Sequence, residues 1–149
     1  GHSHIKKIMR EHDAVYGGEM SAHHYFRDFN YCDSGMIPWL LVAELVSRSG
    51  QGLSEMVARM RADFPSSGEI NFTVADSQAA IDAVVAAFED QTVDLDRLDG
   101  VSVTCDGWRM NIRASNTEPV LRLNVEAKGD RSLVEAKVAE VRAVLERIA

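Results

Sequence analysis

The sequence predicts an α+β fold, in which an antiparallel sheet is covered on one face by two helices. Apolar and polar residues alternate over residues 101–105 and again over 108–113, and Asp106-Gly107 between them is typical of a two-residue hairpin turn. Apolar residues recur at helical spacing in one segment before this hairpin and in another near the C-terminus. With further strands at 69–74 and 119–127, the element order is β-α-β-β-β-α.

The first 62 residues are predicted to contain helices and one short strand. Residues 3–13 have helical character and lead into a short strand at 14–16. A strongly apolar helix is expected at 36–47, with Pro38 in its first turn, where proline is tolerated. Its apolar residues indicate burial on most sides, as in an α/β layer: Trp39, Leu40, Val42 and Leu45. The next helix carries one apolar stripe, formed by Leu53, Met56, Val57 and Met60.

The segment from Asp63 to Gly68 interrupts the helical pattern. It contains Pro, Ser and Gly, which end helices and form linkers, so we expect one domain at 1–64 and another at 65–149. In the second domain, Asp76 or Ser77 opens a helix whose face carries Ile81, Val84, Val85 and Phe88. Asp130 or Ser132 caps the last helix, which carries Val134, Val138, Val141, Leu145 and Ile148 at helical spacing.

Neither of two possible metal motifs fits its known pattern. The acidic stretch between residues 89 and 99 hints at an EF-hand loop, but that loop requires Glu where Cys105 stands, so a solvated linker is expected. The potential ligands near the N-terminus match no closed zinc site: His2, His4, His23, His24, Cys32 and Asp33. We therefore predict no metal site formed by this chain.

Composition narrows the classes of partner. A net charge of -7 argues against general nucleic-acid binding, which needs a basic surface, but a few local arginines would suffice for a sugar phosphate. No signal peptide is apparent, and no apolar run is long enough to span a membrane. Cys32 and Cys105 are far apart without a CxxC pattern, so we expect reduced thiols in a cytoplasmic protein.

The stretch from Arg113 to Pro119, RASNTEP, has the donors of a phosphate-binding loop. Arg113 offers paired donors that fit phosphate oxygens. The hydroxyls of Ser115 and Thr117, the amide of Asn116 and successive turn N–H groups add further donors. None of these groups can act as a nucleophile on its own, so the loop predicts binding. The alternative is an ordinary turn beside a solvated arginine.

A second motif, GEMSAHHYF over residues 18–26, precedes it. The two motifs, in this order, resemble the α-D-phosphohexomutase family, specifically the bacterial phosphomannomutase/phosphoglucomutase group. The stretch RASNTEPVLRLNVE is similar to the family's phosphate-binding loop, and GEMSAH to its sugar-recognition loop. The resemblance implies that Glu19 and Ser21 hydrogen-bond hexose hydroxyls and that His23 lies near the reacting end of the sugar. The alternative is a strand entering a Gly-Gly turn with a surface carboxylate.

The opening GHSHIK is similar to a family segment that contributes a histidine to the active-site cleft. By this resemblance His2 is a second candidate catalytic residue beside His23. The alternative is that residues 1–4 derive from a tag. Ile5 to Arg10 continue as a helix in the place that the family would have one, which favours the first interpretation.

The resemblance also implies an architecture and an activity. Residues 65–149 would form the family's C-terminal domain, which resembles the TATA-binding protein in fold, and residues 1–64 would be the second half of the third, mixed α/β domain. The parent enzyme would interconvert hexose 1-phosphates and 6-phosphates of mannose or glucose, with Mg²⁺ and with glucose or mannose 1,6-bisphosphate as activator. The family's phosphoserine and magnesium loops do not occur in this sequence.

Two hypotheses follow. The first is the substrate-recognising C-terminal portion of a phosphomannomutase/phosphoglucomutase, inactive alone and completed by upstream domains. The second is a non-catalytic sugar-phosphate-binding or interaction module. An assay for mutase activity, with and without an added N-terminal part, separates them.

Overall fold

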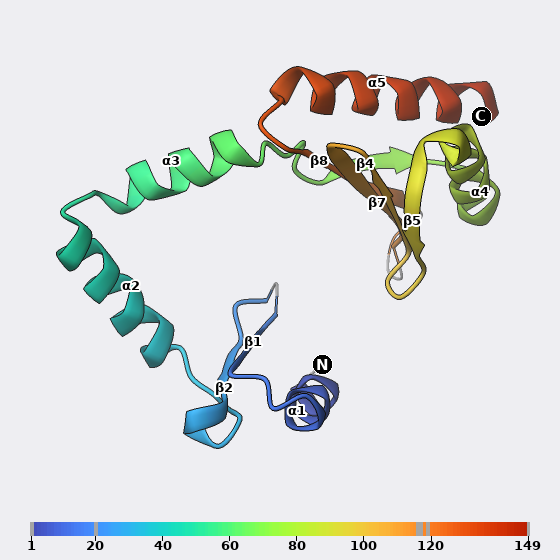
Figure 1. Ribbon diagram of the computed structural model, residues 1–149. Helices are drawn as coiled ribbons and strands as arrows, with labels where there is room; N and C mark the ends of the chain where they lie inside the picture. Colours follow the sequence, from blue (N-terminus) through green and yellow to red (C-terminus); the bar gives the residue numbers. More distant parts are fainter. Residues whose placement is uncertain (1, 20, 116–117, 119, 149) are drawn as a thin grey trace. The chain divides into compact units, whose positions relative to one another are not determined.

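The structure is a computed structural model that describes residues 2–19, 21–115, 118 and 120–148. It divides into two compact units, Gly1–Glu55 and Met56–Ala149, which we describe separately (Figure 1). The sequence predicts domains at 1–64 and 65–149. This domain boundary is a different quantity from the division into compact units, and it stays a prediction.

The first unit is built on a small antiparallel sheet with the order β1-β2-β3. Its strands are β1 (Tyr16–Gly18), β2 (His24–Phe26) and β3 (Cys32–Asp33), preceded by helix α1 (His2–Glu11) and followed by α2 (Met36–Ser49). Met9 of α1 and Tyr25 of β2 are the buried apolar side chains of this unit among the described residues. A Cβ on Gly17 would lie 2.6 Å from the Met9 sulfur, so a larger residue there would require the Met9 side chain to move where α1 packs on β1.

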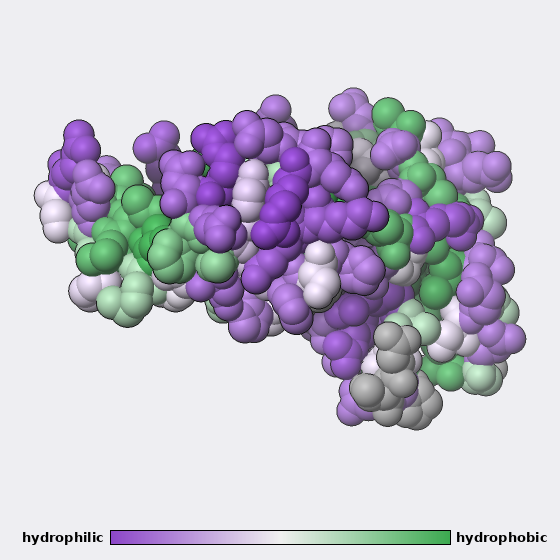
Figure 2. Space-filling view, turned by 90° about the horizontal axis from the view of Figure 1, so that it is seen from below, coloured by the Kyte–Doolittle hydropathy of each residue, from purple (hydrophilic) through white to green (hydrophobic). Residues whose placement is uncertain are grey.

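Helix α2 corrects the expectation of burial on most sides. None of its residues is buried, and Trp39 and Leu40 are 61% and 55% exposed. Figure 2 shows the result as a hydrophobic patch at the left of the view, where α2 lies. The sequence indicated the helix and its apolar character correctly. Burial failed because the three short strands of this unit provide no layer that covers the helix.

The second unit contains a five-stranded antiparallel sheet with the order β4-β8-β7-β6-β5. The strands are β4 (Ile70–Thr73), β5 (Thr92–Asp96), β6 (Val101–Cys105), β7 (Trp108–Ala114) and β8 (Val120–Ala127). Helices α4 (Ser77–Ala87) and α5 (Arg131–Ile148) pack on one face (Figure 1), and alternate residues of β6, β7 and β8 join them in one core. Helix α3 (Leu53–Asp63) precedes this sheet in the chain. The α+β fold predicted from the sequence is confirmed.

Strand β5, like β2 and β3 of the first unit, was not predicted from the sequence, and it lies in the acidic stretch interpreted as a solvated linker. It pairs with β6 through Leu95↔Val103 and Asp96↔Ser102, after an irregularity in register between Thr92 and Asp94. Four of its five residues are exposed, so no buried alternation marks it as a strand. Aspartates on an edge strand also discourage pairing with another sheet edge.

The cap residues of α4 and α5 are aspartates. Asp76 accepts hydrogen bonds from the backbone N–H groups of Gln78 and Ala79 at 2.9 and 3.0 Å. Asp130 accepts from the Ser132 hydroxyl at 2.7 Å and from the Leu133 N–H at 3.0 Å, and these bonds, the first being the larger cause, lower the Asp130 pKa. Of the alternatives left by the sequence, the structure therefore selects Asp76 and Asp130.

Candidate functional site

The predicted sugar loop is the connection between β1 and β2. The Glu19 N–H donates to the His23 carbonyl at 2.9 Å, and the Ala22 N–H donates to the Glu19 carbonyl at 3.0 Å, which closes a tight hairpin loop. Gly17 and Gly18 belong to β1, so the Gly-Gly turn considered as an alternative is wrong. The strand also begins at Tyr16 rather than Ala14.

A depression of about 410 Å³ lies beside this loop. The structure brings four residues singled out in the sequence to its lining: His2, Glu19, Ser21 and His23. Three more that the sequence analysis did not assign complete it: Lys6, Tyr25 and Asp33. Helix α1 supplies two of the seven residues and the β1–β2–β3 sheet with its loop supplies the others.

Tyr25 fixes the carboxylate of Glu19. The Tyr25 hydroxyl donates to Glu19 Oε1 at 2.5 Å, and the Ser21 hydroxyl donates to Oε2 at 3.4 Å. The bond to Tyr25 is the main cause of a lowered pKa for Glu19, and it raises the pKa of Tyr25 to about 12. Glu19 is therefore an ionised, oriented acceptor. Its two oxygens together offer about four acceptor positions, which leaves capacity for further hydroxyl donors.

His23 has a carboxylate partner on β3. Its Nδ1 lies 2.6 Å from Asp33 Oδ2. This hydrogen bond, with the charge of Asp33, raises the pKa of His23, and Glu19 adds a smaller effect in the same direction. The same bond is the first cause of a lowered pKa for Asp33, followed by the Asp33 Oδ1 bond to the His24 N–H.

The pair gives the first unit a defined pH window of stability. The Asp33 pKa is lowered in the folded chain, so its contribution is complete above the ordinary value of 3.8 and is lost as the pH falls through the lowered pKa. The His23 pKa is raised, so its contribution is complete below 6.5 and is lost as the pH rises through the raised pKa. We expect the stability difference between wild type and Asp33→Asn to be largest between these two ordinary values. Thermal unfolding of both chains across pH measures it, and a difference independent of pH would contradict the expectation.

In the second unit, Arg113 lies near the end of β7 and faces Arg122 of β8. The two are direct cross-strand partners, with side chains 28% and 26% exposed. Glu69 lies between them, with carboxylate oxygens 3.8 Å from Arg113 Nη2 and 3.7 Å from Arg122 Nε. The Arg122 Nε is buried and has no hydrogen-bond partner among the described residues. The pair thus retains donor capacity toward an added anion.

The turn beyond Arg113 is partly described. The Ser115 N–H donates to the Val120 carbonyl at 2.9 Å, and the Glu118 N–H donates to the Ser115 hydroxyl at 3.3 Å. Asn116 and Thr117, both predicted to bind phosphate, lie outside the described residues. The loop therefore connects β7 and β8 directly, with Arg113 and Arg122 at its base.

Gly100 controls how closely the preceding turn approaches Arg113. A Cβ on Gly100 would overlap the Cβ of Arg113 and would lie 2.6 Å from the Ile112 carbonyl oxygen. Gly100 also has φ +68°, a conformation that disfavours every other residue type. The Asp99 carboxylate beside it lies 3.9 Å from Arg113 Nη1.

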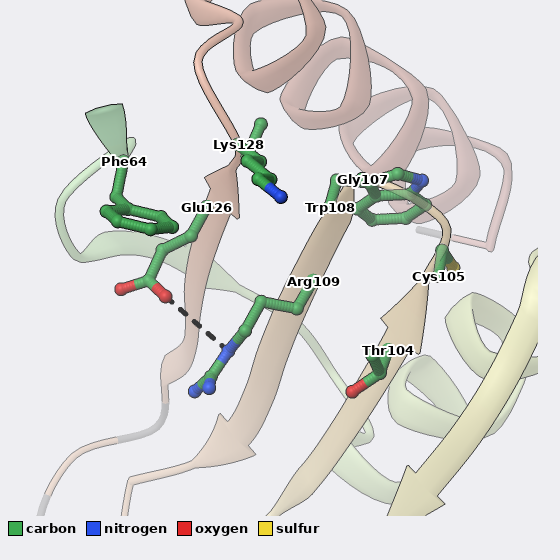
Figure 3. Close-up of a pocket in the computed structure, with 9 residues that line it drawn as sticks. Phe64, Thr104, Cys105, Gly107, Trp108, Arg109, Glu126 and Lys128 are labelled. Atoms are coloured by element: carbon green, nitrogen blue, oxygen red, sulfur yellow. Dashed lines mark ion pairs between the residues drawn. The ribbon is translucent and has the colours of Figure 1, made fainter. Parts of the chain in front are cut away.

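A second hollow, of about 220 Å³, lies at the other end of β7 (Figure 3). Cys105, Trp108 and Ala127 form its buried apolar floor, with Phe64 among the exposed residues at its edge. Arg109 of β7 forms an ion pair with Glu126 of β8, with Nε 3.5 Å from Oε2. No residue predicted to bind the substrate lines this hollow.

The partners that sequence reasoning missed were hidden by register. Arg122 follows Arg113 by nine residues, and only the pairing Arg113↔Arg122 shows that they are neighbours. Asp33 is likewise ten residues from His23. The β2–β3 pairing of Tyr25 with Asp33 brings it there. A prediction that β2–β3 and β7–β8 are hairpins would have indicated that these residues are neighbours.

Two family models match the chain. The one described as phosphoglucomutase/phosphomannomutase, alpha/beta/alpha domain III, matches residues 1–64, and the one described as the C-terminal domain matches residues 69–144. The chain therefore belongs to the phosphoglucomutase/phosphomannomutase family. This confirms the resemblance noted from its two loops.

Particular relatives agree with the family. A phosphomannomutase of Salmonella montevideo is 60% identical over 141 residues, which cover 95% of this chain and 31% of that protein. A Xanthomonas campestris pv. campestris (strain B100) protein named phosphohexose mutases is 57% identical, over 95% of this chain and 32% of that protein. A crystal structure of a phosphoglucomutase/phosphomannomutase family protein from Burkholderia thailandensis matches with a TM-score of 0.71 and 26% identity, over 99% of this chain and 31% of that one. The chain thus spans about a third of the length of the relatives it matches.

Neither a metal cluster nor a membrane span is found in the part of the chain that the structure describes. No three His, Cys, Asp or Glu side chains there gather as metal ligands would. No helix there has both the length and the apolar character needed to cross a bilayer.

Proposed function

We propose that this chain is the substrate-recognising portion of a phosphomannomutase/phosphoglucomutase that interconverts hexose 1-phosphate and hexose 6-phosphate through a bisphosphorylated sugar. The observation that carries the proposal is the gathering of His2, Glu19, Ser21 and His23 around one depression. Relatives named phosphomannomutase, 60% identical in one case, support it.

The depression in the first unit would bind the hexose ring. Glu19, ionised and oriented by Tyr25, accepts hydrogen bonds from neighbouring sugar hydroxyls, and Ser21 adds a hydroxyl that can donate or accept. A site built on such bonds rejects sugars that lack the matching hydroxyl, because its polar groups would be left unpaired. His23 and His2 line the reacting end, where an imidazole can hold or move a proton at an attacking or leaving oxygen.

The loop between β7 and β8 would bind the phosphate distal to the reacting end. Arg113 and Ser115 act there with Asn116 and Thr117, as the sequence predicts, and we add Arg122 because it lies directly opposite Arg113. Two guanidinium groups on neighbouring strands offer paired donors that fit phosphate oxygens, and a bound phosphate would draw them from long contacts, of 3.4 to 3.9 Å, with the carboxylates of Glu69, Asp99 and Glu118.

Such a clamp suits a reaction in which the sugar must reverse. After the first phosphoryl transfer the bisphosphorylated intermediate turns round, and either of its phosphates must then fit the same clamp. Donors that surround a phosphate without contacting the rest of the ring meet this requirement, whereas a clamp that recognised ring atoms would hold one orientation only.

The chemistry of transfer would come from outside this chain. Phosphoryl transfer needs a donor and, in this family, Mg²⁺ to offset charge on the transferring group. The described residues contain no group of three His, Cys, Asp or Glu side chains that could hold such an ion. We propose that upstream domains supply the phosphoserine and the Mg²⁺ and that glucose or mannose 1,6-bisphosphate serves as activator. The chain alone would be inactive, and the enzyme would be cytoplasmic.

Amide NMR spectra of the chain, titrated with mannose 1-phosphate, test the proposal. Saturable shifts at Ser115 to Thr117 are expected for the phosphorylated sugar and not for mannose, with accompanying shifts at Glu19 to His23. A parallel assay for mutase activity adds the upstream part of the enzyme. Binding without activity in the completed enzyme would favour a non-catalytic sugar-phosphate module, and no shifts at either loop would contradict both functions.

A further inference from the structure

Two adjacent histidines of the first unit have partners of different chemistry. His23 Nδ1 lies 2.6 Å from the Asp33 carboxylate, whereas His24 Nδ1 lies 2.7 Å from the Tyr16 hydroxyl. A carboxylate that is ionised can only accept, so the His23 nitrogen facing it must carry a proton. A phenol can accept or donate, so Tyr16 places no such condition on His24.

Asp33 is itself held in place by β2. Its Oδ1 accepts the His24 N–H at 2.9 Å while its Oδ2 contacts His23, so both carboxylate oxygens are engaged. Its backbone pairs with Tyr25 across the β2–β3 ladder, and the Ser34 N–H donates to the His24 carbonyl at 2.9 Å. The carboxylate therefore cannot turn away without breaking contacts to two consecutive residues.

We propose that Asp33 is a positioning residue that holds His23 in the tautomer protonated at Nδ1 and so keeps Nε2 available to the substrate. The inference rests on the proposed function, which gives His23 its role. It adds that Nε2 is the nitrogen of His23 that exchanges protons with the substrate. Neutral His23 then presents a lone pair at Nε2 that can accept a hydroxyl proton. Protonated His23 presents an Nε2–H that can donate to a phosphate or leaving oxygen.

Other charged groups line the same depression. Lys6 and His2 approach from α1 and Glu19 from the β1–β2 loop, while Asp33 comes from β3. Of these, Asp33 is the one whose contact is short and directed at a ring nitrogen of His23. Glu19 favours the protonated ring through its charge without selecting a tautomer.

The tautomer can be measured on the 149-residue chain with ¹⁵N-labelled histidine. In wild type above its titration midpoint, His23 is expected to show a protonated Nδ1 and an unprotonated Nε2. Asp33→Asn should abolish this preference and move the His23 midpoint toward 6.5, its ordinary value. Tyr16→Phe is the matched control, because it removes the partner of the neighbouring ring, and it should leave His23 unchanged.

The tautomer measurements on the Asp33 and Tyr16 variants can each overturn the proposal. An unaltered His23 tautomer and midpoint in a folded Asp33→Asn chain would overturn the proposal, and so would an equal change in Tyr16→Phe. Should Asp33→Asn unfold the unit, Asp33→Glu decides: it retains the carboxylate and should restore the Nδ1-protonated form, and its failure to do so in a folded chain would overturn the positioning role.

Kinetics of the completed enzyme separate this inference from the proposed function. Asp33→Asn should lower kcat and shift the pH profile, with little change in KM, because the carboxylate acts through His23. One outcome is that Asp33→Asn abolishes the tautomer preference as expected while a His23→Asn enzyme keeps full activity. That outcome overturns the catalytic role of His23, and the orientation of its ring then serves no catalytic purpose. If Asp33→Asn leaves the His23 tautomer unaltered while His23 remains essential for activity, the positioning role alone is overturned.

Discussion

Replacing Arg113 with Gln should weaken binding of mannose 1-phosphate to this chain by about 10- to 150-fold. A hydrogen bond to a charged group contributes about 1.5–3 kcal/mol, and each 1.4 kcal/mol is about tenfold in affinity. Arg113 is 28% exposed at the base of the β7–β8 loop, and its ion pairs with the described residues are long, at 3.8 and 3.9 Å. Its donors are therefore free to turn toward a phosphate. Titration calorimetry measures the change.

Arg109 supplies the matched control for this variant. It lies on the same strand and on the same open face, four residues away, but beside Glu126 and the second hollow. Arg109→Gln removes the same charge from the same sheet and should leave binding within a factor of two or so, as expected for an exposed surface pair. An equal loss in both variants would mean that general charge, rather than the loop, attracts the phosphate. Unchanged binding in Arg113→Gln would remove the loop from the site.

Replacing Gly100 with Ala should destabilise the second unit by about 2–5 kcal/mol. The left-handed conformation costs an L-residue about 1–2 kcal/mol, and overpacking adds about 1–3 kcal/mol. The new methyl group would overlap Arg113 and lie 2.6 Å from the Ile112 carbonyl oxygen. A loss of this size lowers the melting temperature of a 60–100-residue domain by about 8 °C or more. Calorimetry of the chain measures this, and phosphate affinity should fall with it because Arg113 must move.

Gly107 isolates the steric part of the prediction. It has φ +78°, close to that of Gly100, but a Cβ there would meet nothing within 4 Å. Gly107→Ala therefore carries the conformational cost alone and should leave phosphate binding intact. Equal destabilisation by the two substitutions would show that the approach of Gly100 to Arg113 is not tight.

The C-terminal sheet was predictable where burial imposed a period. Val101, Val103 and Cys105 face the core in alternation, and so do Trp108, Met110 and Ile112 across the Asp106-Gly107 turn. Strand β5 lacked this signal, because an edge strand with one face in solvent needs few apolar residues. Helix α2 gave the opposite error, since its apolar residues predict a covering layer that the described unit does not contain.

The candidate site was predictable in its loops and not in its partners. Glu19, His23 and Arg113 belong to contiguous motifs, which a sequence displays directly. Asp33 and Arg122 reach their positions through strand pairing, and pairing depends on turns whose register the sequence specifies only weakly. Sequence-based prediction therefore found residues that are proposed to contact the substrate, and it missed the residues that lie beside them on neighbouring strands.

The unequal burial of the two tryptophans gives each unit its own optical reporter. Trp39 on α2 is 61% exposed, whereas Trp108 is 6% exposed and packs edge-on against Phe88 with ring centroids 5.4 Å apart. Indole emission shifts to longer wavelength in water, so Trp39 should emit to the red and be accessible to quenchers, and Trp108 should emit to the blue and be protected. Any surface that covers α2 would then move the red component alone, while the blue component would report on the five-stranded sheet.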